Sequence, residues 1–357
     1  MTLDDLNRIK RLDSGGVSDS IEVLPLQIRQ VLRDFKKLKI SSSEFSTVTQ
    51  VVVNGMGGSN IGVGVLKAAF GDRLKVPISI TPGYSVPAHV NENTLYVFSS
   101  YSGSTEEPLS VYEEVKSRGA KMLYICAAGG SKLEKLAKKA GIPGYIFKPE
   151  HNPSGQPRLG TGYSIFGIAM LLARAGLYEI DEAQVEKVIA DLESRNKELA
   201  PGSPTAKNRA KQLAAKLFGK QPVIVGAEFL IGNLRVLRNQ FCETSKNFAS
   251  YLVLPDLNHF AMEGLANPAG NGKYLVFLFL DSELYHPRIE KRAQLTKEIV
   301  KKDGIETLEC RLTGETKLDQ AFEMLQLGSW ITFYLGILNQ VNPSEVKWVD
   351  WFKKQLG

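Results

Sequence analysis

Short apolar runs rich in β-branched residues alternate with amphipathic stretches through the first half of the chain. The apolar runs predict strands and the amphipathic stretches predict helices, because a strand and a helix bury side chains with different periods. The expected strands are Val48–Val53, Pro77–Thr81, Leu95–Ser99, Met122–Ile125 and Tyr145–Phe147, and the expected helices are Ile61–Phe70, Glu106–Lys116 and Lys132–Ala140. Strand–helix–strand units with right-handed crossovers form a parallel sheet covered on both faces. The pattern therefore predicts a doubly wound α/β domain.

The second half of the chain repeats this alternation in outline. The expected strands are Pro222–Val225, Tyr251–Leu254, Tyr274–Leu280 and Glu306–Cys310, and the expected helices are Asn233–Asn247 and Arg288–Lys301. Two similar α/β domains with parallel sheets in one chain indicate an ancient duplication. Two further helices, expected at Leu318–Asn339 and Ser344–Leu356, are separated by a Pro-containing turn and predict a C-terminal helical tail.

A segment rich in Pro, Gly and Asn, His151–Arg158, interrupts the alternation, and a mainly helical region follows at Gly162–Leu217. We place a domain boundary at this interruption. The expected organisation is a helical segment at residues 1–40, a first α/β domain at residues 41–152, and a second α/β domain with the C-terminal helices at residues 153–357.

The bulk composition suits a globular protein of two domains, with 43% hydrophobic and 23% charged residues among 357. Charged residues are scattered through residues 1–30, so no signal peptide or membrane span is expected and a cytoplasmic location is predicted. The formal net charge is +6, but basic residues lie beside acidic ones along the whole chain. This distribution favours a small anionic substrate over nucleic acid or a membrane surface as the partner.

Neither a metal nor a cofactor is expected. Cys126, Cys242 and Cys310 are too widely separated for a disulfide framework or a paired-cysteine zinc site. His89, His151 and His286 lie in separate predicted loops, without the i, i+4 pairing that places two histidine ligands on one helix face.

Two strand ends carry residues suited to binding phosphate. Residues 54–60 read NGMGGSN, and residues 100–107 read SYSGSTEE, each between a predicted strand and a predicted helix. Backbone amides at the start of a helix attract anions, glycine lets an oxyanion approach closely, and hydroxyls add donors. Two such turns at one edge of a sheet predict a phosphate cradle in the first domain. The alternative is that the hydroxyls only cap a helix and the glycines only turn the chain.

Neither segment matches a nucleotide-binding motif. Asn60 stands where a dinucleotide fingerprint has its last glycine, and the second strand ends at Thr81-Pro82 without an acidic residue. The chain also has no Gly-Lys-Ser/Thr nucleotide loop.

At Ser100–Thr105 the chain resembles the sugar isomerase (SIS) domain family, in which a hydroxyl-rich loop after a strand holds the phosphate of a phosphosugar. Together with Gly55–Ser59, Glu243–Lys246 and Pro255–His259, this loop makes the chain similar to the bifunctional phosphoglucose/phosphomannose isomerase family of bacteria and archaea. The resemblance covers about residues 40–357. It implies two SIS domains, a homodimer, and cofactor-free interconversion of glucose 6-phosphate or mannose 6-phosphate with fructose 6-phosphate.

The resemblance also implies roles for individual residues. Glu243 would be the proton-abstracting base, Arg158 would stabilise the enediol, and His259 of the partner subunit would open the sugar ring. The C-terminal lysine of the family best matches Lys353, although Lys354 is its neighbour. The residues expected to hold the phosphate are Gly57, Gly58, Ser59, Ser100, Ser102 and Thr105. The chain departs from the family at residues 242–246, which read CETSK rather than NENAK, and at Ser104, where asparagine is common.

These residue types meet the needs of aldose–ketose isomerisation, which are a base near C2, an acid and base for ring opening, and positive charge beside the developing enediolate. Simpler interpretations stay open. Glu243 would otherwise be a surface carboxylate paired with Lys246 at i+3, and His259 an ordinary exposed histidine in a polar turn. Arg158 would otherwise be a solvated arginine.

Three other functions are compatible with parts of the sequence. The first is a different SIS isomerase, such as a one-domain ketose phosphate isomerase or the isomerase half of an amidotransferase, but two tandem domains and the lack of an N-terminal cysteine argue against both. The second is a non-enzymatic phosphosugar sensor, which would not need Glu243. The third is a scaffold whose helices at residues 162–217 form an oligomer seam, which adds little because an isomerase can also be a homodimer.

Overall fold

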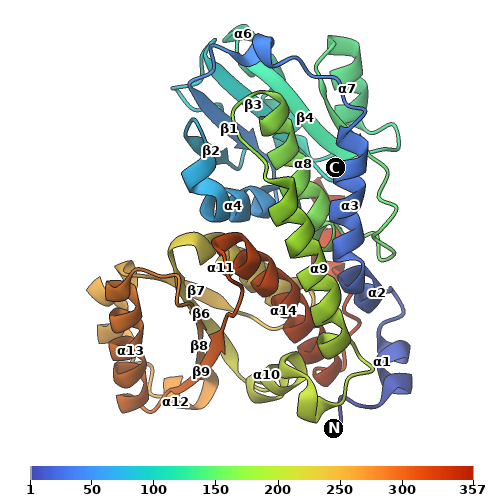
Figure 1. Cartoon of the computed structure of the whole chain (residues 1–357). Coiled ribbons are helices and arrows are strands. Elements are labelled where there is room, and N and C mark those ends of the chain that lie inside the picture. The colour runs from blue at the N-terminus through green and yellow to red at the C-terminus, as the bar shows by residue number, and fades with distance from the viewer. Residues whose placement is uncertain (1, 357) are drawn as a thin grey trace. The chain divides into compact units, whose positions relative to one another are not determined.

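The computed structural model describes residues 2–356, except for the side chains of residues 61 and 72. The chain forms two compact units (Figure 1). The five-stranded unit comprises Val23–Asp191, and the four-stranded unit comprises the chain up to Glu22 together with the chain from Leu192 onward.

The five-stranded unit is a doubly wound domain with a parallel sheet in the order β2-β1-β3-β4-β5, which confirms the predicted fold class. Its strands are β1 (Gln50–Asn54), β2 (Ile78–Thr81), β3 (Thr94–Ser99), β4 (Lys121–Ala127) and β5 (Gly144–Phe147). Its helices are α3 (Leu24–Phe35), η1 (Ser42–Phe45), α4 (Gly58–Phe70), η2 (Gly71–Arg73), α5 (Glu106–Ser110), α6 (Tyr112–Ser117), α7 (Lys132–Ala140), η3 (Pro157–Leu159), α8 (Thr161–Arg174) and the first part of α9 (Glu182–Leu199). The single helix expected at residues 106–116 is therefore two short helices, α5 and α6.

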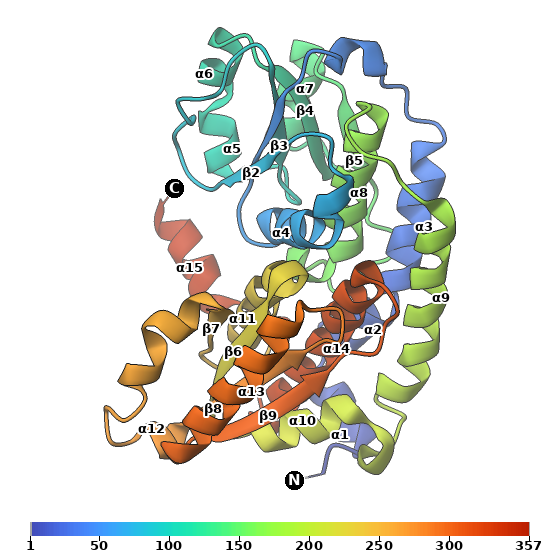
Figure 2. The same ribbon diagram turned by 60° about the vertical axis from the view of Figure 1, so that its left-hand side comes forward.

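Both faces of this sheet are covered by helices. On one face, Tyr96 and Phe98 of β3 belong to a buried apolar cluster. The cluster also contains Val115 of α6, Val111 directly before α6, and Leu133 of α7. On the other face, α8 lies against β4 and β5. The approach is close at Gly167 of α8, where an added Cβ atom would stand only 2.5 Å from Ile125 Cδ1 of β4. Figure 2 shows α3 and α8 beside one another on this side of the sheet.

The four-stranded unit is the second α/β domain, with parallel strands in the order β7-β6-β8-β9. This order matches β2-β1-β3-β4 of the other unit, as the predicted duplication requires. Its strands are β6 (Gln221–Ala227), β7 (Ser250–Leu254), β8 (Leu275–Asp281) and β9 (Glu306–Arg311). Its helices are α1 (Leu6–Leu12), α2 (Val17–Glu22), the end of α9, η4 (Thr205–Lys207), α10 (Arg209–Leu217), η5 (Glu228–Leu230), α11 (Ile231–Glu243), η6 (Asp256–His259), η7 (Ala261–Gly264), α12 (Asn271–Tyr274), α13 (Pro287–Lys302), α14 (Lys317–Leu338) and α15 (Lys347–Leu356).

The central helix of this unit, α14, is buried along almost its whole length. Thr316 and Asp319 form a capping box at its start, and Trp330 stacks on Tyr334 with ring centroids 5.6 Å apart. By length and composition α14 would be able to cross a membrane, but its most apolar window is fully buried inside the fold. Such burial, against α10, α11 and α2, is typical of the core helix of a globular domain.

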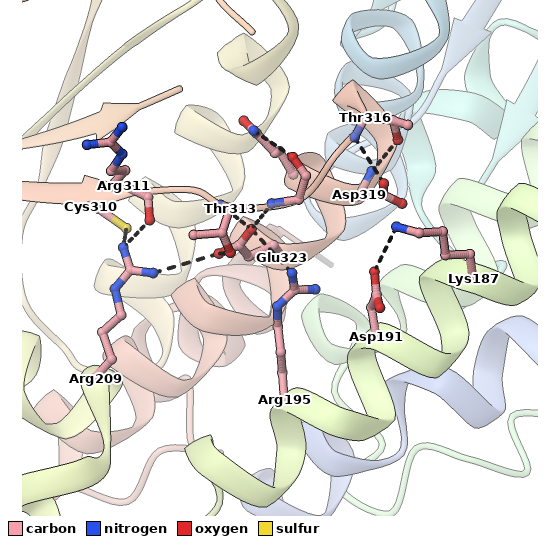
Figure 3. A network of polar contacts seen from close by, with 12 residues as sticks. Lys187, Asp191, Arg195, Arg209, Cys310, Arg311, Thr313, Thr316, Asp319 and Glu323 are labelled. Carbon is pink, nitrogen blue, oxygen red and sulfur yellow. Dashed lines mark hydrogen bonds and ion pairs between the residues drawn. The ribbon is translucent and has the colours of Figure 1, made fainter. Parts of the chain in front are cut away.

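A buried carboxylate fixes the loop that leads into α14 (Figure 3). Glu323 accepts hydrogen bonds from the backbone amides of Thr313 and Gly314, both at 2.9 Å. Its oxygens also lie 3.5 Å from Arg195 Nη2 and 3.7 Å from Arg209 Nη1. Since its side chain is only 4% exposed, these donors replace the water that an ionised carboxylate would otherwise need.

The packing divides the chain at different places from the segments predicted at 1–40, 41–152 and 153–357, whose outer ends, residues 1 and 357, lie outside the described residues. Helices α1 and α2 belong with the second sheet, whereas α3 belongs with the first. Residues 153–191 also pack with the first sheet, because α8 covers β4 and β5 and contacts α3 and α4. The predicted domain bounds themselves stay a prediction.

Candidate functional site

Two loops meet at the carboxyl edge of the five-stranded sheet. One joins β1 to α4, and the other, Ser100–Thr105, joins β3 to α5. The strands are neighbours, with Asn54 opposite Phe98. A Cβ atom at Gly55 would stand 2.5 Å from the carbonyl oxygen of Ser99, so only glycine lets the two loops approach this closely.

Ser59, in the first turn of α4, bonds directly to the second loop. Its Oγ accepts a hydrogen bond from the Tyr101 amide at 2.7 Å, and its carbonyl accepts one from Ser99 Oγ at 3.0 Å. Ser59 and Ser99 are both buried. The two predicted phosphate-binding segments therefore form one hydrogen-bonded structure.

The hydroxyls of Ser100 and Thr105 lie 2.8 Å apart across the second loop. Thr105 occupies the N-cap position of α5 but makes no side-chain capping bond. Its hydroxyl is therefore not used as the simple helix-cap interpretation requires. Ser102 lies exposed between them, and its Oγ accepts a bond from the Ser104 amide at 3.3 Å.

Gly103 allows the loop to turn back on itself. Its φ of 62° lies in the left-handed region, and a Cβ atom there would stand 2.0 Å from Ser131 Oγ. Both facts disfavour a side chain at this position.

Arg158 lies beside the cradle through its backbone. A Cβ atom at Gly58, the first residue of α4, would stand 2.9 Å from the Pro157 carbonyl and 3.3 Å from the Arg158 amide nitrogen. Gly57, which precedes it with a φ of 50°, is the N-cap of α4 and is exposed. The Arg158 side chain is buried, and its Nη1 donates to Gln156 Oε1 at 2.8 Å. The structure thus brings together all six expected phosphate-binding residues and the Arg158 segment in one unit.

Both signs of charge lie near the cradle. The start of α4 contributes the positive end of a helix dipole and Arg158 a full positive charge. Glu106 and Glu107 begin α5. The Glu106 carboxylate accepts a hydrogen bond from the Tyr84 hydroxyl, which raises the pKa of Tyr84 to about 12 and keeps this phenol protonated.

Glu243 lies in the four-stranded unit, as the last residue of α11, and is half-buried. The expected helix ran to residue 247, but the chain leaves the helix at Thr244 and reaches a φ of 55° at Lys246. Lys246 Nζ donates to the main-chain carbonyls of Glu243, at 2.5 Å, and Pro343, at 3.3 Å. The i+3 relation between Glu243 and Lys246 therefore includes a bond to the backbone, which fixes the end of the helix.

His259 ends the short helix η6 and is exposed. The neighbouring residues are held firmly. Leu257 is buried, and Asn258 Nδ2 donates to Thr296 Oγ1 at 2.8 Å while its Oδ1 accepts from Arg292 Nη1 at 3.2 Å. The turn is thus anchored on α13 and presents the imidazole to its surroundings.

Lys353 lies on α15, and both it and Lys354 are exposed. The geometry within this unit does not choose between the two lysines. Glu243, His259 and Lys353 come from three separate elements of the four-stranded unit.

The corresponding edge of the second sheet carries two carboxylates, those of Glu228 and Asp281. Glu228 follows β6 with a φ of 46°, and its carboxylate accepts from the His286 amide at 3.2 Å. Asp281 ends β8 and pairs with Lys297 at 2.7 Å. Burial raises the pKa of Asp281 in spite of this ion pair. The two sheets thus share a strand order but carry different residues at this edge.

Two residues that the sequence analysis did not single out take part in the cradle. Tyr101 stands within the motif SYSGST, but its phenol suggested no role beside the hydroxyls around it. Asn152 stands within the Pro- and Gly-rich interruption, and its side chain bonds to the Tyr101 hydroxyl at 2.8 Å. The contact joins residues 51 positions apart, so no local sequence pattern predicts it. The only signal for Asn152 was its position in a predicted turn.

Comparison with protein families assigns both units. Residues 45–156 match the model of the SIS domain. Residues 206–356 match the model of the bacterial phospho-glucose isomerase C-terminal SIS domain.

Comparisons with whole proteins agree. A bifunctional phosphoglucose/phosphomannose isomerase of Caldicellulosiruptor bescii is 35% identical over 348 residues, covering 95% of this chain and 98% of the relative. The enzyme of the same name from Aquifex aeolicus is 28% identical, covering 86% and 90%. In fold, the chain is similar to a hypothetical protein of Thermus thermophilus (TM-score 0.73, 17% identity, 98% and 93% coverage). It is also similar to a putative phosphosugar isomerase of Clostridium difficile (TM-score 0.67, 14% identity, 96% and 98% coverage). The chain is an isomerase that belongs to the bifunctional phosphoglucose/phosphomannose isomerase family.

Proposed function

We propose that this protein interconverts glucose 6-phosphate and mannose 6-phosphate with fructose 6-phosphate, as the names of its relatives indicate for them. The observation that carries the proposal is the pair of hydroxyls of Ser100 and Thr105, 2.8 Å apart, beside the buried Ser59 at the edge of the first sheet. A cluster of hydroxyls next to a helix start and an arginine segment suits the terminal phosphate of a sugar.

The cradle retains donors for the phosphate. Ser59 Oγ accepts a bond from the Tyr101 amide, so its own proton is available to a phosphate oxygen. Only one proton is used between Ser100 and Thr105, so the other is likewise available. Ser102 adds an exposed hydroxyl, and Gly57 and Gly58 allow the phosphate to approach the amides at the start of α4.

In the proposed reaction, His259 of the partner subunit transfers the proton that opens the sugar ring. Glu243 then removes the proton from C2 of the aldose, and the electrons of that C–H bond form the C1–C2 double bond of an enediol. Arg158 stabilises the negative charge that develops on the oxygens. The former carbonyl electrons pass to the oxygen on C1, which takes up a proton. Return of the C2 proton to C1 and loss of the proton of the C2 hydroxyl, which replaces the one taken up at the C1 oxygen, then give the ketose. We further propose Lys353 as a cationic residue of the site, because it best matches the C-terminal lysine of the family, with Lys354 as its neighbour.

The planar enediol accounts for the use of two epimers. Glucose and mannose 6-phosphates differ only in configuration at C2, and the configuration is lost when C2 becomes planar. One base and one cradle therefore serve both sugars, provided that the pocket allows deprotonation of either face.

The proposed homodimer follows from the same assignment. His259 is exposed on a turn that is itself well anchored, as suits a side chain that completes a site on another subunit. A cytoplasmic location and a metal-free reaction remain predictions.

The test is to supply glucose 6-phosphate and mannose 6-phosphate separately to the purified protein in EDTA and to follow fructose 6-phosphate. Turnover of both sugars supports the proposal. Binding of both without turnover favours a phosphosugar sensor, and activity only after addition of a divalent metal contradicts the metal-free mechanism.

Glu243→Gln provides the matched variant. It preserves the shape of the side chain but removes the proton acceptor, so it should retain sugar-phosphate binding and lose at least about a thousandfold in kcat. Near-normal turnover in this variant would exclude Glu243 as the base.

A further inference from the structure

Tyr101 is fixed on every side within the five-stranded unit. Its amide donates to Ser59 Oγ at 2.7 Å, and its carbonyl accepts from the Ala127 amide at 3.0 Å. Its ring packs edge-on against Phe147, with centroids 5.3 Å apart and an interplanar angle of 67°. The side chain thus extends from the phosphate-binding loop as a rigid arm.

The hydroxyl at the end of this arm meets the segment that carries Arg158. Asn152, which is buried, donates from Nδ2 to the Tyr101 hydroxyl at 2.8 Å and to the Gln156 carbonyl at 3.0 Å. Gln156 Oε1 in turn accepts from Arg158 Nη1 at 2.8 Å. Three hydrogen bonds therefore connect the Tyr101 hydroxyl to the guanidinium.

The ring of Tyr101 also determines how closely this segment approaches. A Cβ atom at Gly160, two residues beyond Arg158, would stand 2.3 Å from Tyr101 Cε2. The segment is held on its other side by Gln27 of α3, whose Nε2 donates to the carbonyls of His151 and Leu159, both at 2.8 Å. Residues 151–160 are thus held between α3 and Tyr101.

We propose that Tyr101 is a positioning residue, whose hydroxyl holds the Arg158 segment, through Asn152, in register with the phosphate cradle. The inference rests on the proposed function, in which the cradle binds phosphate and Arg158 acts on the enediolate. The phosphate and the reacting carbons lie at opposite ends of one substrate. A fixed connection between the group that holds one end and the charge that acts on the other keeps the arginine in place for the transition state.

The test uses Tyr101→Phe, which keeps the ring and removes the hydroxyl. We expect kcat to fall by about tenfold or more. The KM for sugar phosphate and the inhibition constant of inorganic phosphate should change less than about twofold, since the cradle is intact. An unchanged kcat, or an equal loss in phosphate affinity, would overturn the proposal.

The second arm repeats the substitution in an Arg158→Ala background. If Tyr101 acts by positioning Arg158, its hydroxyl has nothing left to position, and Tyr101→Phe should lower kcat by less than about twofold further. A full tenfold loss in both backgrounds would show that Tyr101 does not act through Arg158.

Tyr145→Phe is the matched control. It also removes a buried hydroxyl, which donates to Asp34 at 2.9 Å in the same unit. Tyr145→Phe should lose at least as much thermal stability as Tyr101→Phe, because its hydroxyl bonds to a carboxylate, but only Tyr101→Phe should lower kcat. An equal loss of kcat in both would indicate a general effect of stability and would contradict positioning.

A binding measurement separates this inference from the proposed function. A five-carbon aldonic acid 5-phosphate has a planar carboxylate that resembles the enediolate, and its affinity can be measured by calorimetry. If the wild-type protein does not isomerise either sugar, the proposed function fails, and Tyr101→Phe should still weaken this ligand without weakening inorganic phosphate. If the affinity of each ligand were the same in Tyr101→Phe as in the wild-type protein, the positioning role would be refuted.

Discussion

Replacement of Glu323 tests how far a buried carboxylate stabilises the four-stranded unit (Figure 3). In Glu323→Ala, the amides of Thr313 and Gly314 lose the acceptor that they share at 2.9 Å. Each hydrogen bond to a charged group contributes about 1.5–3 kcal/mol. The two bonds together therefore predict a loss of about 3–6 kcal/mol in the free energy of unfolding.

The two arginines add little to this figure. Arg195 and Arg209 lie 3.5 and 3.7 Å from the carboxylate, and their side chains are 22% and 37% exposed, so water replaces much of what they lose. Glu323→Gln keeps the shape and one oxygen acceptor for the two amides but removes the charge. We expect this variant to lose only about 1–2 kcal/mol.

The assay is urea unfolding of the full chain, with the slope of the transition compared between variants. A loss in midpoint with an unchanged slope reports stability alone. If Glu323→Ala lost less than about 1 kcal/mol, water would be able to satisfy the two amides and the reasoning from burial would be refuted. If Glu323→Gln were as unstable as Glu323→Ala, the arginine pairs rather than the amides would dominate.

Three further substitutions have expected outcomes. The carboxylate of Asp4 accepts a hydrogen bond from the fully buried Lys211 Nζ at 3.0 Å, which lowers the pKa of Asp4. Asp4→Asn should therefore lose about 1 kcal/mol in the free energy of unfolding at pH 7, and the stabilities of wild type and variant should converge as the pH falls through the lowered pKa. A constant difference in stability down to about pH 2 would exclude this pair as the cause. Gly103→Ala should lose about 1–2 kcal/mol of stability from its left-handed backbone, and the contact with Ser131 should add to this loss. Gly119→Ala is the control, because its φ is 71° but the nearest atom to an added Cβ is 3.6 Å away. In thermal unfolding it should show the backbone loss alone. Thr105→Ala should raise KM about tenfold with little change in kcat, and a loss of stability without a change in KM would restore the helix-cap interpretation.

Much of the fold was predictable because it depends on local periodicity. Strands such as β3, whose six residues are all buried, appear in the sequence as continuous apolar runs. The assignment of helices to sheets was not predictable in the same way. An apolar face on α3 or α8 shows that the helix packs against something, but not against which sheet, and this is why the units differ from the predicted segments.

In the candidate site, too, the features that depend on local sequence pattern were predictable and those that depend on long-range contacts were not. The loops after β1 and β3 were predictable, because parallel strands bring their carboxyl ends to one edge and the glycines and hydroxyls follow directly. The contact between Tyr101 and Asn152 was not, because it joins residues 51 positions apart through side chains that no periodic pattern marks. The choice between Lys353 and Lys354 was not either, since both are exposed on the same helix.

The two sheets share a strand order but differ in charge at their carboxyl edges, and this difference bears on which of them would hold the proposed phosphate. Glu228 follows β6 and Asp281 is the last residue of β8, whereas in the first sheet Gly55–Gly57 follow β1 and Ser100–Thr105 follow β3. A phosphate dianion about 6 Å from one carboxylate is repelled by roughly 5 kcal/mol at an effective dielectric constant of about 20. This exceeds what one hydroxyl hydrogen bond to a charged group returns, which is about 1.5–3 kcal/mol. The carboxylates at the edge of the second sheet therefore disfavour phosphate there, which supports the proposal that the loops of the first sheet hold it.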